Sequence, residues 1–209
     1  SVVYILARPY LNILLLIEIA AKIIYFSVNS ILFCIFALLI MYFHIMQKIQ
    51  TYNSPLGNLT LVSNGIALTG IWFEKQKPLQ HILKLPHEVC NLPIFDDTKR
   101  WLDIYFEGDV PNFTPLLCPE GTYFRQQVWN YLLQIPYGKT TTYGALAKKM
   151  ALHLQKQKMS AQAIGGAVGH NPIPIIIPCH RVIGTNGTMT GYASGIWRKE
   201  FLLELESKK

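Results

Sequence analysis

The stretch IPIIIPCHRV, from Ile173 to Val182, places Cys179 at the end of an apolar run and directly before His180 and Arg181. An imidazole or guanidinium group beside a thiol favours the thiolate, which is the nucleophilic form of cysteine. A cysteine in a globular chain is more commonly a small buried hydrophobic side chain. A single Cys-His pair does not decide between a nucleophile and a core residue.

Further motifs lie on both sides of this stretch. They are TTYGALA upstream (Thr141 to Ala147), and TGYASG and RKEFLLELE downstream (Thr190 to Gly195 and Arg198 to Glu206). With NPIPIIIPCHRV (Asn171 to Val182), they resemble the active-site region of the O6-alkylguanine-DNA alkyltransferases, or methylated-DNA:protein-cysteine methyltransferases. A weaker match, SPLGNLTLVSNG (Ser54 to Gly65), resembles the opening of that family's N-terminal domain.

The resemblance implies direct-reversal DNA repair. The alkyl group of O6-alkylguanine in double-stranded DNA would pass irreversibly to the protein's own Cys179, once per molecule, because the thioether product is stable. O4-alkylthymine is a second candidate substrate. The target base would be flipped out of the duplex before transfer. The resemblance implies no cofactor and no obligate protein partner, and it favours a monomer that docks in the minor groove.

Five residues take catalytic roles by this resemblance. Cys179 would be the alkyl acceptor, His180 its base through a water, and Glu206 the group that orients the imidazole, as in hydrolytic triads. Tyr143 would donate its hydroxyl to the leaving guanine, and Asn171 would hold the turn that presents the cysteine. From the residues alone, Glu206 could equally be a solvated helix position, Tyr143 a core residue and Asn171 an ordinary turn residue before proline.

The resemblance also implies residues that bind the flipped base. Main-chain groups of Val182 and Ala193, beside those of the acceptor cysteine, would read the guanine edge, and Tyr192 and Ser194 would line the pocket. Arg181 would either contact a DNA phosphate or brace the loop, and it is included among the candidate DNA contacts.

Two short helices precede the cysteine motif. Thr142 can cap a helix from Tyr143 to about Met150, and Ser160 can cap one from Ala161 to about Gly169. The second is rich in Gly, which lowers helix stability, and the small side chains of its Gly and Ala residues allow a close approach to another surface. The resemblance places this helix in the minor groove, and packing inside the protein is the alternative. The candidate DNA contacts on it are Ala161, Gln162 and Gly165.

The chain departs from the family pattern at two places. Gln162 stands where family members commonly carry an arginine that fills the space left by the flipped base. Glutamine brings no charge and less reach, so we expect DNA binding to be weakened but retained. The segment from Lys148 to Lys158 is several residues longer than usual, and we expect a solvated loop there, with added phosphate contacts as the alternative.

We expect an α+β fold with two domains. Residues 46–119 would form a small α/β domain with an antiparallel sheet, and residues 120–209 a mainly helical, winged-helix-like domain that binds DNA and holds the acceptor. In the first domain, strands at 58–62 and 66–73 flank Asn64-Gly65, which favours a type I′ turn. A helix capped by Thr98 would end at Gly108.

Residues 1–45 form a hydrophobic extension. Ile23 to Phe43 contains no charged side chain over 21 residues, a length that could span a bilayer as a helix. We expect residues 1–45 to lie outside the functional protein, which would start at Met46, with a transmembrane helix at 23–43 as the alternative. A cytoplasmic location is therefore expected.

Charge and cysteine content agree with this interpretation. Residues 120–209 carry 11 Lys+Arg against 4 Asp+Glu, whereas residues 47–119 carry 6 against 7. Phosphate contacts supply the salt-dependent part of DNA affinity, so this asymmetry suits DNA docking, although a basic soluble surface would look the same. The four cysteines, Cys34, Cys90, Cys118 and Cys179, lack the spacing of a zinc site, so no metal is expected.

Other function classes fit part of the pattern. A damage sensor related to the alkyltransferases, or a winged-helix regulator, would bind DNA without transfer, but such sensors replace the acceptor cysteine that is present here. A cysteine hydrolase would need an oxyanion site, for which the sequence gives no signal. The number of alkyl groups removed per protein separates them: one for the transferase, none for the sensor and many for the hydrolase.

Overall fold

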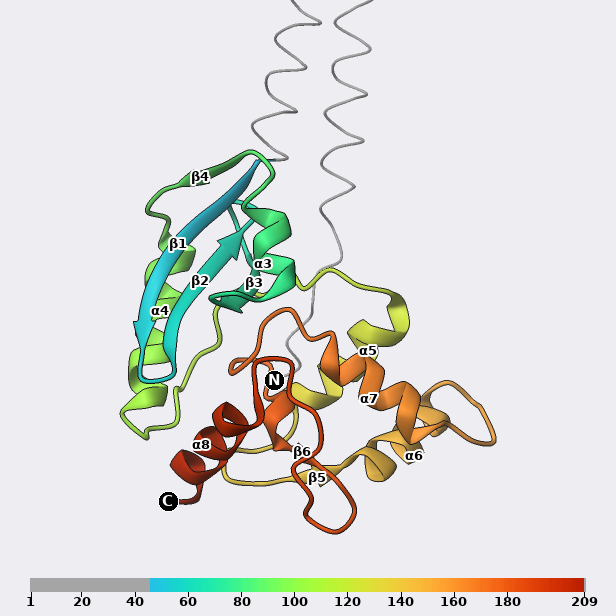
Figure 1. The fold of residues 1–209 in the computed structure, drawn as a ribbon. Helices are drawn as coiled ribbons and strands as arrows, with labels where there is room; N and C mark the ends of the chain where they lie inside the picture. Colours follow the sequence, from blue (N-terminus) through green and yellow to red (C-terminus); the bar gives the residue numbers. More distant parts are fainter. Residues whose placement is uncertain (1–45, 209) are drawn as a thin grey trace, which may run out of the picture.

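The computed structural model describes residues 46–208, with the sheet in the N-terminal half and most of the helices in the C-terminal half (Figure 1). Our expectations for residues 1–45, including a transmembrane helix at 23–43, fall outside the described residues. Within 46–208, no helix is both long and apolar enough to cross a membrane. The α+β class is confirmed.

The N-terminal sheet has four strands in the order β3-β2-β1-β4. Strands β1 (Gln47–Ser54), β2 (Gly57–Ser63) and β3 (Leu68–Phe73) are antiparallel, as expected. Strand β4 (His87–Val89) instead pairs parallel with β1, so the sheet is mixed rather than purely antiparallel. A parallel partner requires a crossover connection, and helix α3 (Lys77–Ile82) lies in the connection that reaches β4.

The β2–β3 connection is a hairpin, but not the predicted type I′ turn. Gly65 has a φ of +100°, whereas Asn64 lies outside the left-handed region that this turn requires at both central residues. The Asn64 side chain accepts hydrogen bonds from the amides of Ile66 and Ala67 at 3.1 and 2.9 Å. The side chain of Asn64 therefore organises a four-residue connection at 64–67.

Helix α4 (Pro93–Phe106) packs across β1, β2 and β3. It begins earlier than expected because Pro93, whose missing amide suits the first turn, starts it. Thr98 is inside the helix and donates its hydroxyl to the Ile94 carbonyl at 2.7 Å, so it is not the cap. The helix ends before Gly108, whose φ of +86° closes it as predicted.

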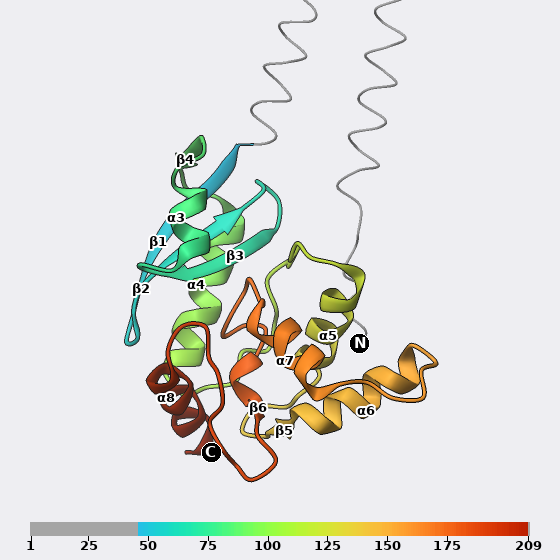
Figure 2. The same ribbon diagram turned by 45° about the vertical axis from the view of Figure 1, so that its right-hand side comes forward.

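The C-terminal half is mainly helical, and Figure 2 shows its helices beside the edge of the sheet. It contains α5 (Tyr123–Leu133), α6 (Tyr143–His153), α7 (Ala161–Gly169), the short 3₁₀ helix η1 (Cys179–Arg181) and α8 (Ile196–Ser207). Strands β5 (Thr141–Thr142) and β6 (Val182–Ile183) form a small parallel pair.

The two helices before the cysteine begin where their caps predict. The Thr142 hydroxyl accepts the Ala145 amide at 3.1 Å, and the Ser160 hydroxyl accepts the Gln162 amide at 3.1 Å. Helix α6, however, continues to His153, so the expected loop over 148–158 is helical in its first half.

The two halves share one hydrophobic core. Strand β3 is the strand nearest the C-terminal half, and the Ile71 amide donates to the Pro172 carbonyl at 2.8 Å. The connecting segment also pairs with β3, through a bridge between Leu68 and Leu117. The start of the cysteine motif is therefore anchored to the N-terminal sheet.

Candidate active site

The segment before the cysteine forms a tightly held turn. Asn171 donates its amide group to the Ile177 carbonyl at 2.8 Å and accepts the Ile173 amide at 3.0 Å. Ile175 has a φ of +75°, a conformation that is strained for a β-branched residue and costs on the order of 1–3 kcal/mol. Burial of the isoleucine run holds this backbone in place, and the turn presents Cys179 at the start of η1.

Cys179 is 6% exposed. Burial raises the pKa of its thiol, while a hydrogen bond with Asn171 and the positive charge of Lys199 oppose this rise in pKa. Lys199 is itself fully buried and donates to the carbonyls of Val182 at 2.5 Å and Thr190 at 3.3 Å. The thiol is therefore protonated at rest and needs a base to become a nucleophile.

His180 follows the cysteine and is fully buried against Glu206. Its Nε2 lies 2.8 Å from Glu206 Oε1. Because a carboxylate only accepts, Nε2 carries the proton and Nδ1 keeps a free lone pair. Nδ1 has no hydrogen-bond partner among the described residues. Burial lowers the pKa of the imidazole, more than Glu206 raises it, so His180 is a neutral base.

The Glu206 carboxylate, on α8, accepts several hydrogen bonds. Arg181 forms a two-point pair with its carboxylate at 2.8 and 2.9 Å, Tyr105 donates its hydroxyl at 2.7 Å, and the Gly138 amide donates at 3.1 Å. Burial would raise the pKa of this carboxyl, but the hydrogen bonds from His180 and Arg181 and the positive charge of Arg181 prevail and lower the pKa to about 2. The carboxylate is therefore charged at every physiological pH.

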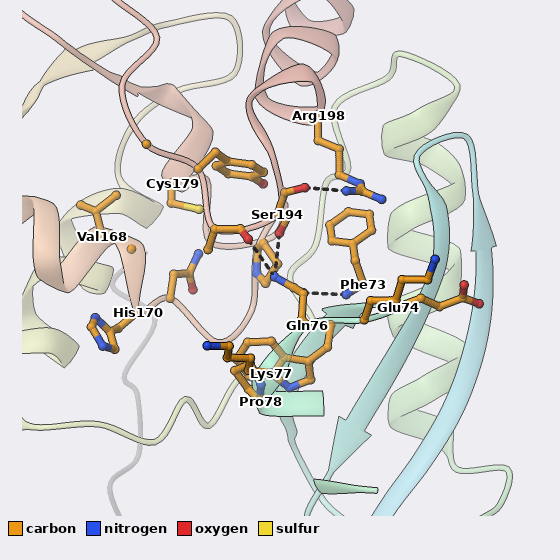
Figure 3. Close-up of a pocket in the computed structure, with 18 residues that line it drawn as sticks. Phe73, Glu74, Gln76, Lys77, Pro78, Val168, His170, Cys179, Ser194 and Arg198 are labelled. Carbon is orange, nitrogen blue, oxygen red and sulfur yellow. Dashed lines mark hydrogen bonds between the residues drawn. The ribbon is translucent and has the colours of Figure 1, made fainter. Parts of the chain in front are cut away.

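A cavity of about 520 Å³ opens beside the Cys179 sulfur, a volume typical of small-molecule sites (Figure 3). Its C-terminal wall includes Cys179, Asn171 and the loop Tyr192, Ala193 and Ser194. Its opposite wall is residues 72–78 of the N-terminal half. The Cys179 thiol thus faces a ligand-sized space, and the residue after it, His180, is a neutral imidazole paired with a charged carboxylate.

Comparison with known families gives two matches that together cover most of the chain. The 6-O-methylguanine DNA methyltransferase ribonuclease-like domain matches residues 48–117, and the DNA binding domain of the same name matches residues 123–208. The chain belongs to the 6-O-methylguanine DNA methyltransferase family.

Similar proteins carry a consistent name. Methylated-DNA--protein-cysteine methyltransferases of Methanosarcina acetivorans and Haemophilus influenzae are 44% and 43% identical over 156 residues, which is 74% of this chain and 95% and 83% of theirs. The Mycobacterium tuberculosis protein OGT, solved in complex with DNA, is 41% identical with a TM-score of 0.66, over 77% of this chain and 93% of that one.

Within this family framework, the structure brings together Cys179, His180, Glu206 and Asn171, which sequence analysis had named together. Tyr143 lies at the start of α6, half-buried, and its hydroxyl donates to the Thr190 carbonyl at 3.1 Å. Burial raises the pKa of the Tyr143 phenol, so it stays protonated and able to donate. Tyr192, Ala193 and Ser194 line the cavity as expected.

Two expected contacts need correction. Arg181 is 8% exposed and donates to Glu206 and, at 2.6 Å, to the Ile135 carbonyl, so it braces the site instead of offering a phosphate contact. Val182 is fully buried and does not line the cavity, and its carbonyl already accepts Lys199.

On α7, the candidate DNA contacts fall on two sides. Ala161 and Gln162 are exposed at its first turn. Gly165 instead faces the Tyr143 ring, and a Cβ there would lie 3.8 Å from two ring atoms. The small residue at 165 therefore serves helix packing against Tyr143.

Three polar contributors to the site were missed from the sequence. Tyr105 lies on α4, and nothing in the sequence around it signals that its hydroxyl reaches Glu206. Lys199 sits on α8, where a lysine usually indicates a solvated face, yet it is fully buried. Gln76 comes from the N-terminal half, where no motif connects it with the cysteine region.

Proposed function

We propose that Cys179 is the alkyl acceptor in this chain, which acts as a methylated-DNA:protein-cysteine methyltransferase in direct-reversal DNA repair. The observation that carries the assignment is the position of Cys179 beside a ligand-sized cavity, next to the His180 and Glu206 pair. Its close relatives are named for this transfer, and the similar OGT binds DNA in its solved complex.

The proton route follows from the imidazole tautomer. Nδ1 of His180 would take the thiol proton of Cys179 through one water, and Glu206 would stabilise the imidazolium that results. The thiolate would then attack the alkyl carbon of O6-alkylguanine. A sulfur–carbon bond forms, and the carbon–O6 bond breaks with its electron pair leaving on O6. The Tyr143 hydroxyl, which now contacts Thr190, would donate a hydrogen bond to the leaving guanine.

The flipped base would occupy the cavity against the Tyr192 to Ser194 loop, with main-chain groups of Ala193 reading its edge. Because nothing in the site reverses a thioether, each molecule would act once. The exposed first turn of α7, with Ala161 and Gln162, would enter the minor groove, and the excess positive charge of residues 120–209 supports docking of that half on DNA.

We extend the proposal to the organisation of the chain. A division at about residues 119 and 120 is supported by the two family matches, 48–117 and 123–208. A monomer in the cytoplasm suits a repair protein whose described cysteines, Cys90, Cys118 and Cys179, are free thiols.

Intact-protein mass spectrometry after incubation with duplex DNA containing O6-methylguanine tests the proposal. The full chain and a version starting at Met46 should each gain the mass of one CH₂ group, and Cys179→Ala should gain none. Tight binding to the lesion without any mass gain would assign the protein to the damage sensors. Repeated turnover with no mass gain would indicate a hydrolase.

A further inference from the structure

One side chain of the N-terminal half hydrogen-bonds the opposite wall of the cavity. Gln76, between β3 and α3, accepts the Phe73 amide at 2.7 Å. Its amide nitrogen donates to the Ser194 hydroxyl at 3.1 Å and to the Ala193 carbonyl at 3.4 Å (Figure 3). A residue 118 positions away in the sequence thus holds the loop that lines the cavity beside Cys179.

Arg198 holds the same loop from its other side. Its guanidinium donates to the Ser194 carbonyl at 2.5 Å and to the Leu56 carbonyl at 3.1 Å. It also stacks over the Phe73 ring, 4.1 Å from the centroid. The loop is therefore held by two side chains. Gln76 belongs to the N-terminal half, and Arg198 contacts that half.

The loop has little structure of its own to resist movement. Residues 191–195 belong to no helix or strand, and α8 begins directly after them. Gly191 and Gly195, with φ of +51° and +100°, flank it, and glycine adopts such backbone conformations without steric cost. The position of the loop, and so the width of the cavity facing the Cys179 sulfur, depends on its two anchors.

We propose that Gln76 is a positioning residue that fixes the Tyr192 to Ser194 loop and thereby limits the size of the O6-alkyl group that the cavity accepts. The inference rests on the proposed function, because the Cys179 sulfur marks where the alkyl carbon must lie. With the anchor in place the loop holds a small alkyl group in line with the thiolate. Without it the cavity widens, so small groups lose alignment and bulky groups gain room.

The test compares second-order transfer rates of the full chain with duplexes that contain O6-methylguanine or O6-benzylguanine. Gln76→Met keeps the length of the side chain and removes its hydrogen bonds. The methyl rate should fall at least about fivefold, the factor expected for the loss of one neutral hydrogen bond, because the variant removes the contact to Ser194 and the two other bonds of Gln76. The ratio of the benzyl rate to the methyl rate should rise. Gln80→Met, an exposed position on α3, is the matched control and should leave both rates unchanged.

Ser194→Ala tests the partner of the contact. It should raise the same ratio, and the double variant with Gln76→Met should change the methyl rate no more than the larger single change, because both remove one interaction. If both rates fall by the same factor in Gln76→Met, with a lower melting temperature, Gln76 only supports the fold and the inference is overturned. Unchanged rates and ratio overturn it as well.

The proposed function fails in a different way. If the unaltered chain carried its alkyl group on a residue other than Cys179, or carried none, the assignment of the acceptor would be wrong. A loss of selectivity in Gln76→Met or Ser194→Ala, with the alkyl group still on Cys179, leaves that assignment intact.

Discussion

The Cys179 thiol lies within the influence of a buried cation. Burial raises the pKa of this thiol, and the positive charge of Lys199 opposes that rise. Because the ammonium also donates to the Val182 and Thr190 carbonyls, it is held between β6 and the residue that precedes the Gly191 to Gly195 loop. A lysine held in this way can assist the thiolate without contacting the substrate.

Lys199→Met should therefore raise the pKa of Cys179 and move the acid limb of the pH–rate profile for alkyl transfer to higher pH. Lys208→Met, an exposed position after the end of the same helix, should leave the profile in place. The measurement is the transfer rate to O6-methylguanine duplex across the neutral to alkaline range. A slower variant with an unmoved profile would assign Lys199 a purely structural role.

Tyr105→Phe should destabilise the protein by about 2 kcal/mol, because a hydroxyl that donates to a charged acceptor contributes more than one that donates to a neutral group. Tyr137→Phe removes a hydroxyl from the same aromatic cluster, but one that donates to the neutral Gly108 carbonyl at 3.3 Å, so its effect should be smaller. Urea unfolding of both variants measures the difference. Equal losses of unfolding free energy in the two variants would show that the Tyr105 hydrogen bond to Glu206 stabilises the protein no more than the Tyr137 hydrogen bond does.

Local chemistry marked Cys179 only as a candidate, and the family resemblance was needed to name the central site; neither indicated the surroundings of that site. Pro178, Cys179, His180 and Arg181 are adjacent in sequence, and the resemblance added Glu206. Tyr105 contacts Glu206 across 101 positions, and the neighbours that a side chain meets at such separation depend on how the elements pack. No local pattern carries that information.

Elements were predicted well where a side chain caps them. Thr142 and Ser160 set the starts of α6 and α7, because each hydroxyl accepts an amide that the helix leaves unpaired. The start of α4 was placed too late because Thr98 could cap a helix, while the proline that begins it offers no side-chain bond. Strand β4 has only three residues and pairs through the backbone, which leaves little pattern to recognise.

At the scale of one helix, α7 allows a direct test of DNA docking. Gln162→Arg adds a cation at its exposed first turn, so lesion-duplex affinity should rise and the slope of log K against log salt should steepen by about one. Gln157→Arg adds the same charge in the loop before α7 and is the matched control. An equal effect from both variants would show that charge alone, and not the position on α7, governs binding.

Across the whole molecule, the site depends on both halves. Glu206 on α8 is contacted by Tyr105 from α4, Gln76 holds the loop, and Ile71 holds the start of the cysteine turn. The predicted division into two domains follows the sequence motifs. The shared core and these contacts show that residues of both halves form the site. Sequence analysis assigned no site residue to the N-terminal half, because each of its contributions is a long-range contact.

The low pKa of Glu206 links overall stability to pH. The pKa of its carboxyl falls from 4.5 to about 2 on folding, so its contribution is complete above pH 4.5 and is lost as pH falls towards 2. Since a tenfold change in a protonation equilibrium is worth about 1.4 kcal/mol, the loss is about 3 kcal/mol. His180, whose pKa is lowered, adds a loss in the same direction below pH 6.5.

Urea unfolding from pH 6 to pH 3 measures this dependence. The unaltered chain should lose stability steeply over that range. Glu206→Gln should be less stable at pH 6, because Arg181 is left buried without its partner, and should show a flatter pH dependence. Parallel curves for the two proteins would exclude Glu206 as a source of the acid sensitivity.

The order of the site residues along the chain has a consequence during synthesis. His180 is joined to Glu206 across 26 residues, and ribosomes add about 5–20 residues per second, so the cysteine motif is made about one to five seconds before its carboxylate. Until α8 packs, the imidazole has no fixed tautomer and Lys199 has not reached the thiol. Until α8 packs, the nascent chain therefore lacks the oriented base and the nearby cation that the proposed transfer requires.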